Sequence, residues 1–240
     1  MASPRFWIDS PLSPGADIEL PPQASRHVSV LRLRDGDEIT LFNGNGGEHE
    51  ARLLRLVRDR AYVRVGAHRD VERESPLRVT LALGISSGDR MDYAIQKATE
   101  LGAARVAPIE TERSVVRLSA ERAERRVAHW RGVAIASCEQ SGRNRVPRIE
   151  PVRDLDQFVV DEPDGLRLLL APEGDTQLAA LERSSDLTLL IGSEGGLSPR
   201  ERDRALKAGF LAVRFGPRVL RTETAPLAVL AALQALWGDC

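Results

Sequence analysis

The sequence predicts an α/β protein that is preceded by a small β-barrel, because the hydrophobic period changes along the chain. Short runs of β-forming residues dominate up to about residue 70, whereas strand and helix patterns alternate after Pro76. The apolar runs 166–170 and 187–191 are typical of central strands in a parallel sheet that is covered on both faces. We therefore predict two domains, residues 1–72 and residues 73–240.

Composition indicates a globular protein. The chain has 240 residues, of which 42% are hydrophobic, enough for one large core or two modest ones. No signal-peptide pattern opens the sequence and the apolar stretch 225–237 is too short to span a bilayer, so we expect a cytoplasmic protein without a membrane partner. Cys138 and Cys240 form no CxxC pair and the histidines are scattered, so we expect no disulfide framework and no metal.

The first domain is predicted from four β-like runs and one short helix. The runs are residues 5–8, 38–42, 48–57 and 61–67. Residues 43–47 (NGNGG) favour a hairpin turn, since Asn and Gly accept positive φ. The helical pattern covers residues 23–33 and gives the barrel a basic rim, which consists of Arg26, His27, Arg32 and Arg34.

The second domain is predicted from alternating strands and helices. The strands are expected at residues 77–83, 105–109, 166–170, 187–191 and 211–215. A helix containing Met91 and Ile95 is expected to stop at Gly102, and a longer helix begins near Ser119 with an apolar stripe that includes Trp130. The last helix, 225–237, is apolar on nearly all sides, which fits either core burial or a dimer seam.

Two glycine-containing loops follow two of these strands. The first is residues 191–196 (IGSEGG) and the second is residues 215–225 (FGPRVLRTETA). A capping box formed by Ser198 and Glu201, with Pro199 at the first helical position, predicts a helix directly after the first loop. We expect both loops at the carboxyl edge of the sheet, where α/β proteins bind ligands.

The loops favour a nucleoside over a phosphate as the ligand. Glycines let a ligand touch bare backbone, and a helix N-terminus after the loop suits an anion. However, the chain contains neither a Walker A motif nor a GxGxxG fingerprint. A purely structural role for Gly195 and Gly196 in a tight turn is the alternative.

Charge is uneven although the net charge is only −1. Residues 112–148 contain nine arginines and four glutamates, a pattern that fits a strip facing phosphates. A solvated helix face with Glu/Arg pairs is an equally good interpretation.

Several motifs resemble those of the RsmE family, the uridine-N3 methyltransferases of bacterial 16S ribosomal RNA. They are residues 192–198 (GSEGGLS), 220–225 (LRTETA), 237–239 (WGD), 5–9 (RFWID), 88–102 (GDRMDYAIQKATELG) and 139–143 (EQSGR). The resemblance runs nearly end to end. Ser193, Leu197 and Arg26 depart from the family pattern, but they leave the glycines of the loop in place.

The resemblance implies a SPOUT fold, in which the C-terminal α/β domain forms a trefoil knot that binds S-adenosylmethionine. It also implies a PUA-like RNA-binding barrel, a homodimer and 16S ribosomal RNA of the small ribosomal subunit as the substrate. The residues that would bind the cofactor are Leu170, Ile191, Gly192, Glu194, Gly195, Gly196, Phe215, Gly216, Leu220, Arg221, Thr222, Thr224 and Ala225.

Uridine N3 carries a proton, so the acceptor must be deprotonated or polarised before it can attack. We assign Arg221 to stabilise charge on a flanking carbonyl oxygen, and Glu223 or Glu194 to take the proton or hold Arg221. A structural Arg221–Glu223 ion pair is the alternative.

The predicted RNA contacts are Arg5, Arg26, His27, Arg32, Arg34, Lys97, Arg113 and Arg143. Two other function classes stay open at this point. One is a noncatalytic RNA-binding or ribosome-assembly protein, and the other is a different SPOUT enzyme that acts on transfer RNA or on a ribose hydroxyl.

Overall fold

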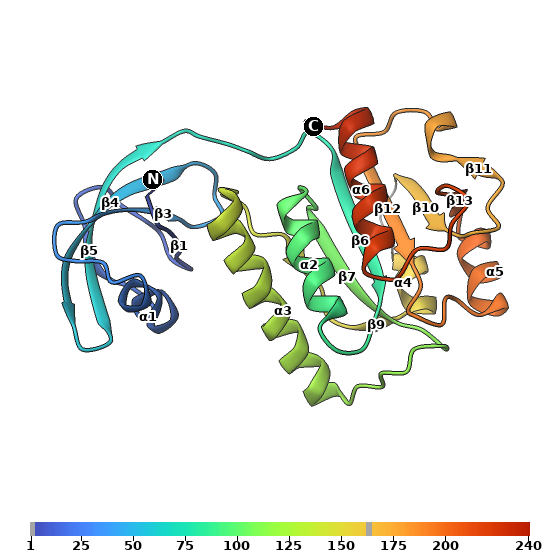
Figure 1. Cartoon of the computed structure of the whole chain (residues 1–240), viewed down its shortest axis with the longest axis horizontal. Helices are drawn as coiled ribbons and strands as arrows, with labels where there is room; N and C mark the ends of the chain where they lie inside the picture. The colour runs from blue at the N-terminus through green and yellow to red at the C-terminus, as the bar shows by residue number, and fades with distance from the viewer. Residues whose placement is uncertain (1–2, 162–164) are drawn as a thin grey trace. The chain divides into compact units, whose positions relative to one another are not determined.

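The structure is a computed structural model that describes residues 3–161 and 165–240 and forms two compact units (Figure 1). The first unit contains the chain up to Glu74 together with Ile135–Val146, and the second contains Ser75–Ala134 and Pro147–Cys240. The predicted border between residues 72 and 73 does not include this return of residues 135–146 to the first unit. The border between the two functional domains stays a prediction.

A five-stranded mixed sheet forms the first unit, with one helix packed against β5. In spatial order the strands are β1 (Arg5–Trp7), β3 (Glu38–Phe42), β4 (Glu48–Val57), β5 (Arg60–Arg69) and β2 (Asp17–Glu19), and the helix is α1 (Pro22–Val30). β1 runs parallel to β3, and the other neighbouring pairs are antiparallel.

The core of the first unit lies on one face of this sheet. Buried and more exposed residues alternate along much of β4 and β5, because successive side chains of a strand point to opposite faces. Phe6, Leu41, Leu53 and Val63 are completely buried there, together with Val28 of α1. Burial of this apolar face stabilises the folded unit.

Eight strands form the sheet of the second unit, and all their pairings are parallel. The spatial order is β11-β13-β10-β12-β6-β7-β8, and β9 also pairs with β7. The strands are β6 (Arg78–Gly84), β7 (Arg105–Glu110), β8 (Arg148–Ile149), β9 (Arg153–Asp154), β10 (Leu166–Leu170), β11 (Thr176–Gln177), β12 (Asp186–Ile191) and β13 (Leu211–Arg214). The helices after residue 75 are α2 (Arg90–Glu100), α3 (Ala120–Ser141), α4 (Leu155–Asp161), the short 3-10 helix η1 (Leu178–Ala180), α5 (Pro199–Lys207) and α6 (Thr224–Trp237).

Helix α5 begins with the predicted capping box. The hydroxyl of Ser198 accepts a hydrogen bond from the backbone N–H of Glu201 at 3.1 Å, and the Glu201 carboxylate accepts one from the N–H of Ser198 at 2.8 Å. Pro199 is the first helical residue, and Gly209 lies beyond the helix with φ +87°. The end of the first glycine loop is therefore fixed by the start of α5.

Helix α6 packs against α2 and β12. Leu230 and Leu233 are completely buried, whereas Leu236 is about half exposed. The amide of Gln234 is buried but satisfied, because it donates to the Leu101 carbonyl at 2.9 Å and accepts from the Ser75 hydroxyl at 2.6 Å. Core packing thus accounts for one face of this helix.

Each predicted strand and helix is present, with ends that differ by at most three residues. The helix predicted to reach residue 33 ends at Val30, since Arg32 has φ +56° and cannot continue a right-handed helix. Six short elements were not predicted, because they are too short to show a clear period: β2, β8, β9, β11, α4 and η1. Of the helices in the described residues, none combines the length and the apolar character needed to cross a membrane.

Candidate active site

Both glycine loops lie at the carboxyl edge of the parallel sheet, as predicted. The first loop follows β12 and the second follows β13, and β10 lies between these two strands (Figure 1). Because the three strands are parallel, their C-terminal ends meet at one edge. A cavity of about 770 Å³ opens there and is lined by both loops and by the end of β10.

The first loop packs so closely that a side chain would clash at two positions, one in β6 and one in the loop itself. A Cβ atom on Gly84, the last residue of β6, would lie 2.2 Å from the backbone nitrogen of Ser193. A Cβ atom on Gly192 would lie 2.7 Å from the carbonyl carbon of Gly196. These distances are far below van der Waals contact, so glycine is needed both at the end of β6 and in the loop, which exposes bare backbone to the cavity.

A hydrogen bond joins the second loop to the first. The hydroxyl of Thr222 donates to the Gly192 carbonyl oxygen at 3.2 Å and lies 3.3 Å from the hydroxyl of Ser86, which follows β6. The backbone N–H groups of Thr224 and Ala225 both donate to the carbonyl oxygen of Arg221 at 2.9 Å, where α6 begins. The cavity wall is thus built from segments that are distant in sequence.

Charged groups at the cavity form a small network. The Glu194 carboxylate accepts hydrogen bonds from the Ser87 backbone N–H at 2.8 Å, from the Ser87 hydroxyl at 2.9 Å and from Arg90 Nη1 at 2.8 Å. Burial raises the pKa of Glu194, but these hydrogen bonds outweigh it, so that the pKa lies below the ordinary value. Glu194 is therefore held as a carboxylate.

Glu223 differs from Glu194 because one of its carboxylate oxygens lacks a hydrogen bond. Its Oε2 atom is buried and has no hydrogen-bond partner among the described residues, and its nearest cation is Arg90 Nε at 4.0 Å. Arg221 is exposed and lines the same cavity. The described residues show no ion pair between Arg221 and Glu223, the structural alternative considered for these two residues. A buried carboxylate oxygen without a hydrogen bond is costly, and at a cavity it is available to a ligand that donates one.

Two protein-family models match this chain, one in its N-terminal part and one in its C-terminal part. The RNA methyltransferase domain matches residues 73–234, and the RNA methyltransferase PUA domain matches residues 20–66. The chain is also 33% identical to the ribosomal RNA small subunit methyltransferase E of Bacillus subtilis over 226 residues, which is 88% of each chain. This chain belongs to the ribosomal RNA small subunit methyltransferase E family.

Other methyltransferase E proteins and solved structures agree over nearly the whole chain. The methyltransferase E of Buchnera aphidicola subsp. Schizaphis graminum is 30% identical and covers 98% of this chain and 97% of its own. A Neisseria gonorrhoeae methyltransferase E solved with S-adenosylmethionine has a TM-score of 0.93, 41% identity and 99% coverage of both chains. A Legionella pneumophila protein in complex with bound SAM has a TM-score of 0.97, 39% identity and 100% coverage of both chains. The predicted family, α/β fold and PUA domain are confirmed.

In the methyltransferase domain, the cavity collects nearly all of the predicted cofactor residues. Thr224 is the exception and does not line it. Predicted catalytic residues Arg221, Glu223 and Glu194 all line it. Their roles in binding and catalysis stay predictions.

Several residues that this site uses were not assigned from the sequence, among them Arg90, Gly84, Ser86 and Ser87. Arg90 reaches Glu194 and Glu223, and it lies in the GDRMD motif that contributed to the family resemblance. Gly84 is the last residue of β6 and Ser86 follows it, and they belong to the site because Gly84 approaches the first loop and Ser86 contacts Thr222 of the second. Only the motif gave a signal in the sequence, because the other contacts depend on the fold.

The residues predicted to contact RNA differ in how exposed they are to solvent. Arg26, Arg32 and Arg34 are exposed in the first unit, and His27, also exposed, lies 3.7 Å from a Glu139 carboxylate oxygen. In the methyltransferase domain, two more remain close to the surface. Lys97 pairs with Glu100 at 2.7 Å, and Arg113 lines the cavity.

Two further predicted RNA contacts lie in the first unit, where Arg143 is buried and Arg5 is partly buried. Arg5 forms an ion pair with Glu48 and donates to Asn144 Oδ1 at 2.6 Å. Arg143 is only 4% exposed and donates to Glu74 from its Nε at 3.0 Å. These contacts engage both guanidinium groups within the first unit, and a role of either arginine toward RNA stays a prediction.

Proposed function

We propose that this chain methylates N3 of a uridine in 16S ribosomal RNA of the assembled small subunit, with S-adenosylmethionine as the methyl donor. We further propose that it acts in the cytoplasm as a homodimer, and that its methyltransferase domain contains the trefoil knot implied by the family resemblance. The family and the solved relatives with bound donor support the proposed reaction. The exposed arginines Arg26, Arg32 and Arg34 support an RNA partner.

The cavity suits the donor in three respects. Its glycine loops present bare backbone where a side chain would clash, its walls include Leu170, Ile191 and Leu220, and a buried oxygen of Glu223 lacks a partner among the described residues. Apolar walls with a few convergent polar groups are the usual surroundings of a bound nucleoside. The residues that would line its binding site are the predicted ones except Thr224, with Thr222 fixing one loop to the other.

When bound, S-adenosylmethionine supplies an electrophilic methyl group on a positively charged sulfur. The chain's main contribution is to align the uridine with that group, since alignment of reacting atoms can contribute several kcal/mol, up to about 7–11 kcal/mol. The cavity must also exclude water from the reacting atoms. The joined glycine loops serve this positioning.

Activation of uridine N3 requires removal of its proton. We assign this step to Glu223, because its Oε2 atom accepts no hydrogen bond from the described residues, whereas Glu194 accepts three hydrogen bonds, which lower its pKa. Arg221, exposed at the same cavity, stabilises the negative charge that develops on a neighbouring carbonyl oxygen of the base. Glu194 instead fixes Arg90 beside Glu223.

The observation that carries this proposal is the cavity formed by two hydrogen-bonded glycine loops with a buried, unpaired Glu223 oxygen. The test is to incubate the protein with small ribosomal subunits that lack the modification and with labelled donor, then to identify the labelled nucleoside by mass spectrometry. N3-methyluridine in 16S ribosomal RNA is the expected product. Label on transfer RNA or on a ribose hydroxyl would identify a different enzyme.

Single variants test the assigned roles. Glu223→Gln and Arg221→Ala should each lower kcat by about 10²-fold or more, while donor binding persists. Full activity of both variants would remove the assignment. Calorimetry with S-adenosylmethionine supplies the control, because a noncatalytic RNA-binding protein would release no heat of donor binding. Sedimentation of the purified chain tests the homodimer.

A further inference from the structure

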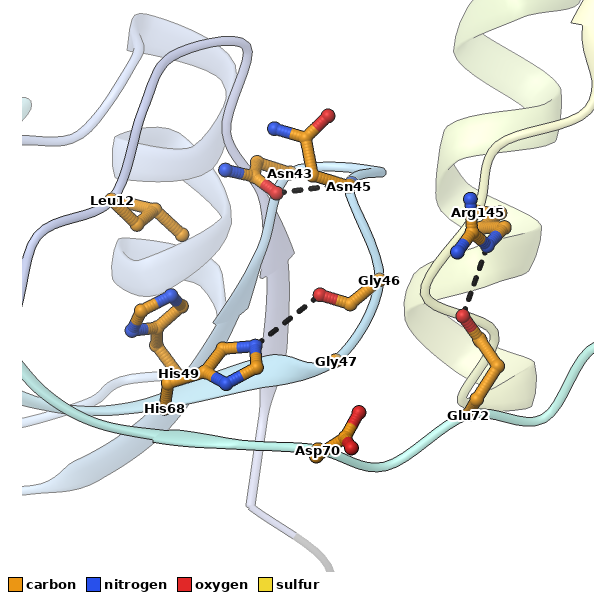
Figure 2. A pocket seen from close by; sticks show the side chains of 10 residues that line it. All are labelled: Leu12, Asn43, Asn45, Gly46, Gly47, His49, His68, Asp70, Glu72 and Arg145. Atoms are coloured by element: carbon orange, nitrogen blue, oxygen red, sulfur yellow. Dashed lines mark hydrogen bonds and ion pairs between the residues drawn. The ribbon is translucent and has the colours of Figure 1, made fainter.

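The first unit contains a second cavity, of about 510 Å³, which the proposed reaction does not use (Figure 2). It lies between the β3–β4 turn, the end of β5 and the segment after α3. Its lining residues are Leu12, Asn43, Asn45, Gly46, Gly47, His49, His68, Asp70, Glu72 and Arg145.

The glycine turn gives this cavity a fixed wall. Gly46 and Gly47 have φ of +94° and +63°, and the Asn45 backbone N–H donates to Asn43 Oδ1 at 3.1 Å. A Cβ atom on Gly47 would lie 2.3 Å from His68 Nε2, so the turn packs directly against the imidazole. His68 Nε2 is also 3.3 Å from the Gly46 carbonyl oxygen, as Figure 2 shows.

Two imidazole rings, those of His49 and His68, form part of the wall. The ring centroids of His49 and His68 lie 4.9 Å apart with an angle of 61° between the planes. His49 is only 8% exposed, and its Nδ1 atom has no hydrogen-bond partner in the part of the chain that the structure describes. Burial lowers the pKa of His49, and His68 adds to the effect, so that His49 is neutral at pH 7.

Asp70 supplies an unused acceptor at this wall. Glu72 is engaged by Arg145, whose Nε donates to its carboxylate at 2.9 Å. By contrast, the Asp70 carboxylate makes no hydrogen bond or ion pair with the other lining residues drawn in Figure 2. The Asn45 side-chain amide is likewise unpaired within this set.

These groups select the chemistry of a ligand. The carboxylate of Asp70 repels a phosphate group, and no three histidine, cysteine, aspartate or glutamate side chains of the described chain converge as metal ligands. A planar ring with adjacent N–H donors suits the site better, because it can stack on an imidazole and donate to a carboxylate. Among nucleobases, guanine presents two adjacent N–H donors on its Watson–Crick edge.

We propose that this cavity binds an unpaired guanine of the RNA substrate, with Asp70 accepting from the base and His68 stacking on it. Asn45 is placed to contact another edge of the base, and Arg145 remains free to contact the attached backbone with the donors that Glu72 does not use. The proposal rests on the proposed RNA substrate. It adds a base-specific contact to phosphate contacts that carry no sequence information.

The test compares two substitutions that remove the same charge. Asp70→Asn alters the cavity, whereas Asp59→Asn alters an exposed carboxylate of the same unit outside it. Binding of the full-length chain is measured by fluorescence anisotropy with a single-stranded RNA hexamer that contains one guanosine. A second hexamer carries inosine there, which lacks the 2-amino group.

We expect Asp70→Asn to weaken binding of the guanosine hexamer by about tenfold and to abolish the preference over inosine. Asp59→Asn should leave binding unchanged or strengthen it slightly, because it removes a charge that repels phosphates. The inference is overturned if Asp70→Asn strengthens binding as Asp59→Asn does, or if the wild-type chain binds both hexamers equally.

A separate readout distinguishes this inference from the proposed function. Wild-type methyl transfer to unmodified small subunits tests the reaction without reference to Asp70. Active wild-type enzyme together with an unaffected Asp70→Asn variant overturns only the guanine site. Because Asp70 is exposed, thermal unfolding of Asp70→Asn should match that of the wild-type chain, which confirms that a binding loss is not a folding defect.

Discussion

The hydroxyl of Thr222 lies 3.2 Å from the carbonyl oxygen of Gly192, and this hydrogen bond connects the loop after β13 to the loop after β12. The strand between them, β10, keeps their parent strands apart, so the connection is made beyond the sheet edge. The geometry of the cavity therefore depends on a side chain as well as on the backbone.

Thr222→Val should loosen this connection with little change in side-chain volume. We expect the Kd for S-adenosylmethionine to rise about fivefold, which corresponds to the loss of roughly 1 kcal/mol from one hydrogen bond. Calorimetry measures the change. Thr222→Ser retains the hydroxyl and should bind like the wild-type chain, and equal affinities of Val and Ser variants would contradict the structural role.

The lowered pKa of Glu194 predicts a dependence of stability on pH. Because its hydrogen bonds favour the carboxylate over the protonated form, their stabilisation is present above the ordinary value of 4.5 and is lost as the pH falls through the lower pKa of the folded state. The difference in unfolding free energy between wild-type and Glu194→Gln should thus shrink in acid. Glu182→Gln is the control for the loss of an exposed charge, and a difference independent of pH would contradict the prediction.

Gly84 and Gly132 form a matched pair for a glycine-to-alanine test. A Cβ on Gly84 would meet Ser193, whereas a Cβ on Gly132 of α3 would meet nothing within 4 Å. We expect Gly84→Ala to destabilise the fold by about 1–3 kcal/mol and Gly132→Ala to stabilise it by about 0.5–1 kcal/mol in urea unfolding. Effects of the same sign would show that the close approach at Gly84 is tolerated.

Ser198→Ala should remove the cap of α5. One N-terminal N–H of the helix loses its acceptor, so we expect a loss of about 1 kcal/mol in unfolding free energy. Ser198→Asp retains an acceptor and should recover most of it. If the alanine variant is as stable as the wild-type chain, the capping box does not stabilise the helix.

Arg143 and Arg34 should separate a structural arginine from an RNA contact. Arg143→Met leaves Glu74 without its partner and should destabilise the chain by about 3–5 kcal/mol. Arg34→Ala should leave stability unchanged, lower RNA affinity and reduce the salt slope by about one. Unfolding and RNA-binding measurements check both variants, and a stable Arg143→Met with weakened RNA binding would reverse the assignment.

The sequence predicted the features that depend on local patterns. The glycine loops, the capping box at Ser198 and the buried strand 187–191 each have a period or a motif within a short window. Contacts between residues that are distant in the sequence have no such period or motif. Arg90 reaches Glu194 across more than one hundred positions, and Arg143 finds Glu74 at a separation of 69 positions, so only the folded chain reveals these partners.

Arg143, which is only 4% exposed, shows the limit of charge counting. A run of arginines predicts a positive surface only if their guanidinium groups are exposed, and burial is decided by packing. The cavity near His49 had no signal in the sequence for the same reason, because its residues come from separate segments of the first unit.

Because Ile135–Val146 belongs to the first unit, this unit cannot form all of its contacts until these residues have been synthesised. Arg5 bonds to Asn144, and the Trp7 backbone N–H donates to Glu139 at 3.0 Å, so both early residues must wait for partners that are synthesised much later. A nascent chain halted after Glu74 would lack those partners. A recombinant fragment truncated at that point should therefore be poorly stable unless the later segment is fused to it.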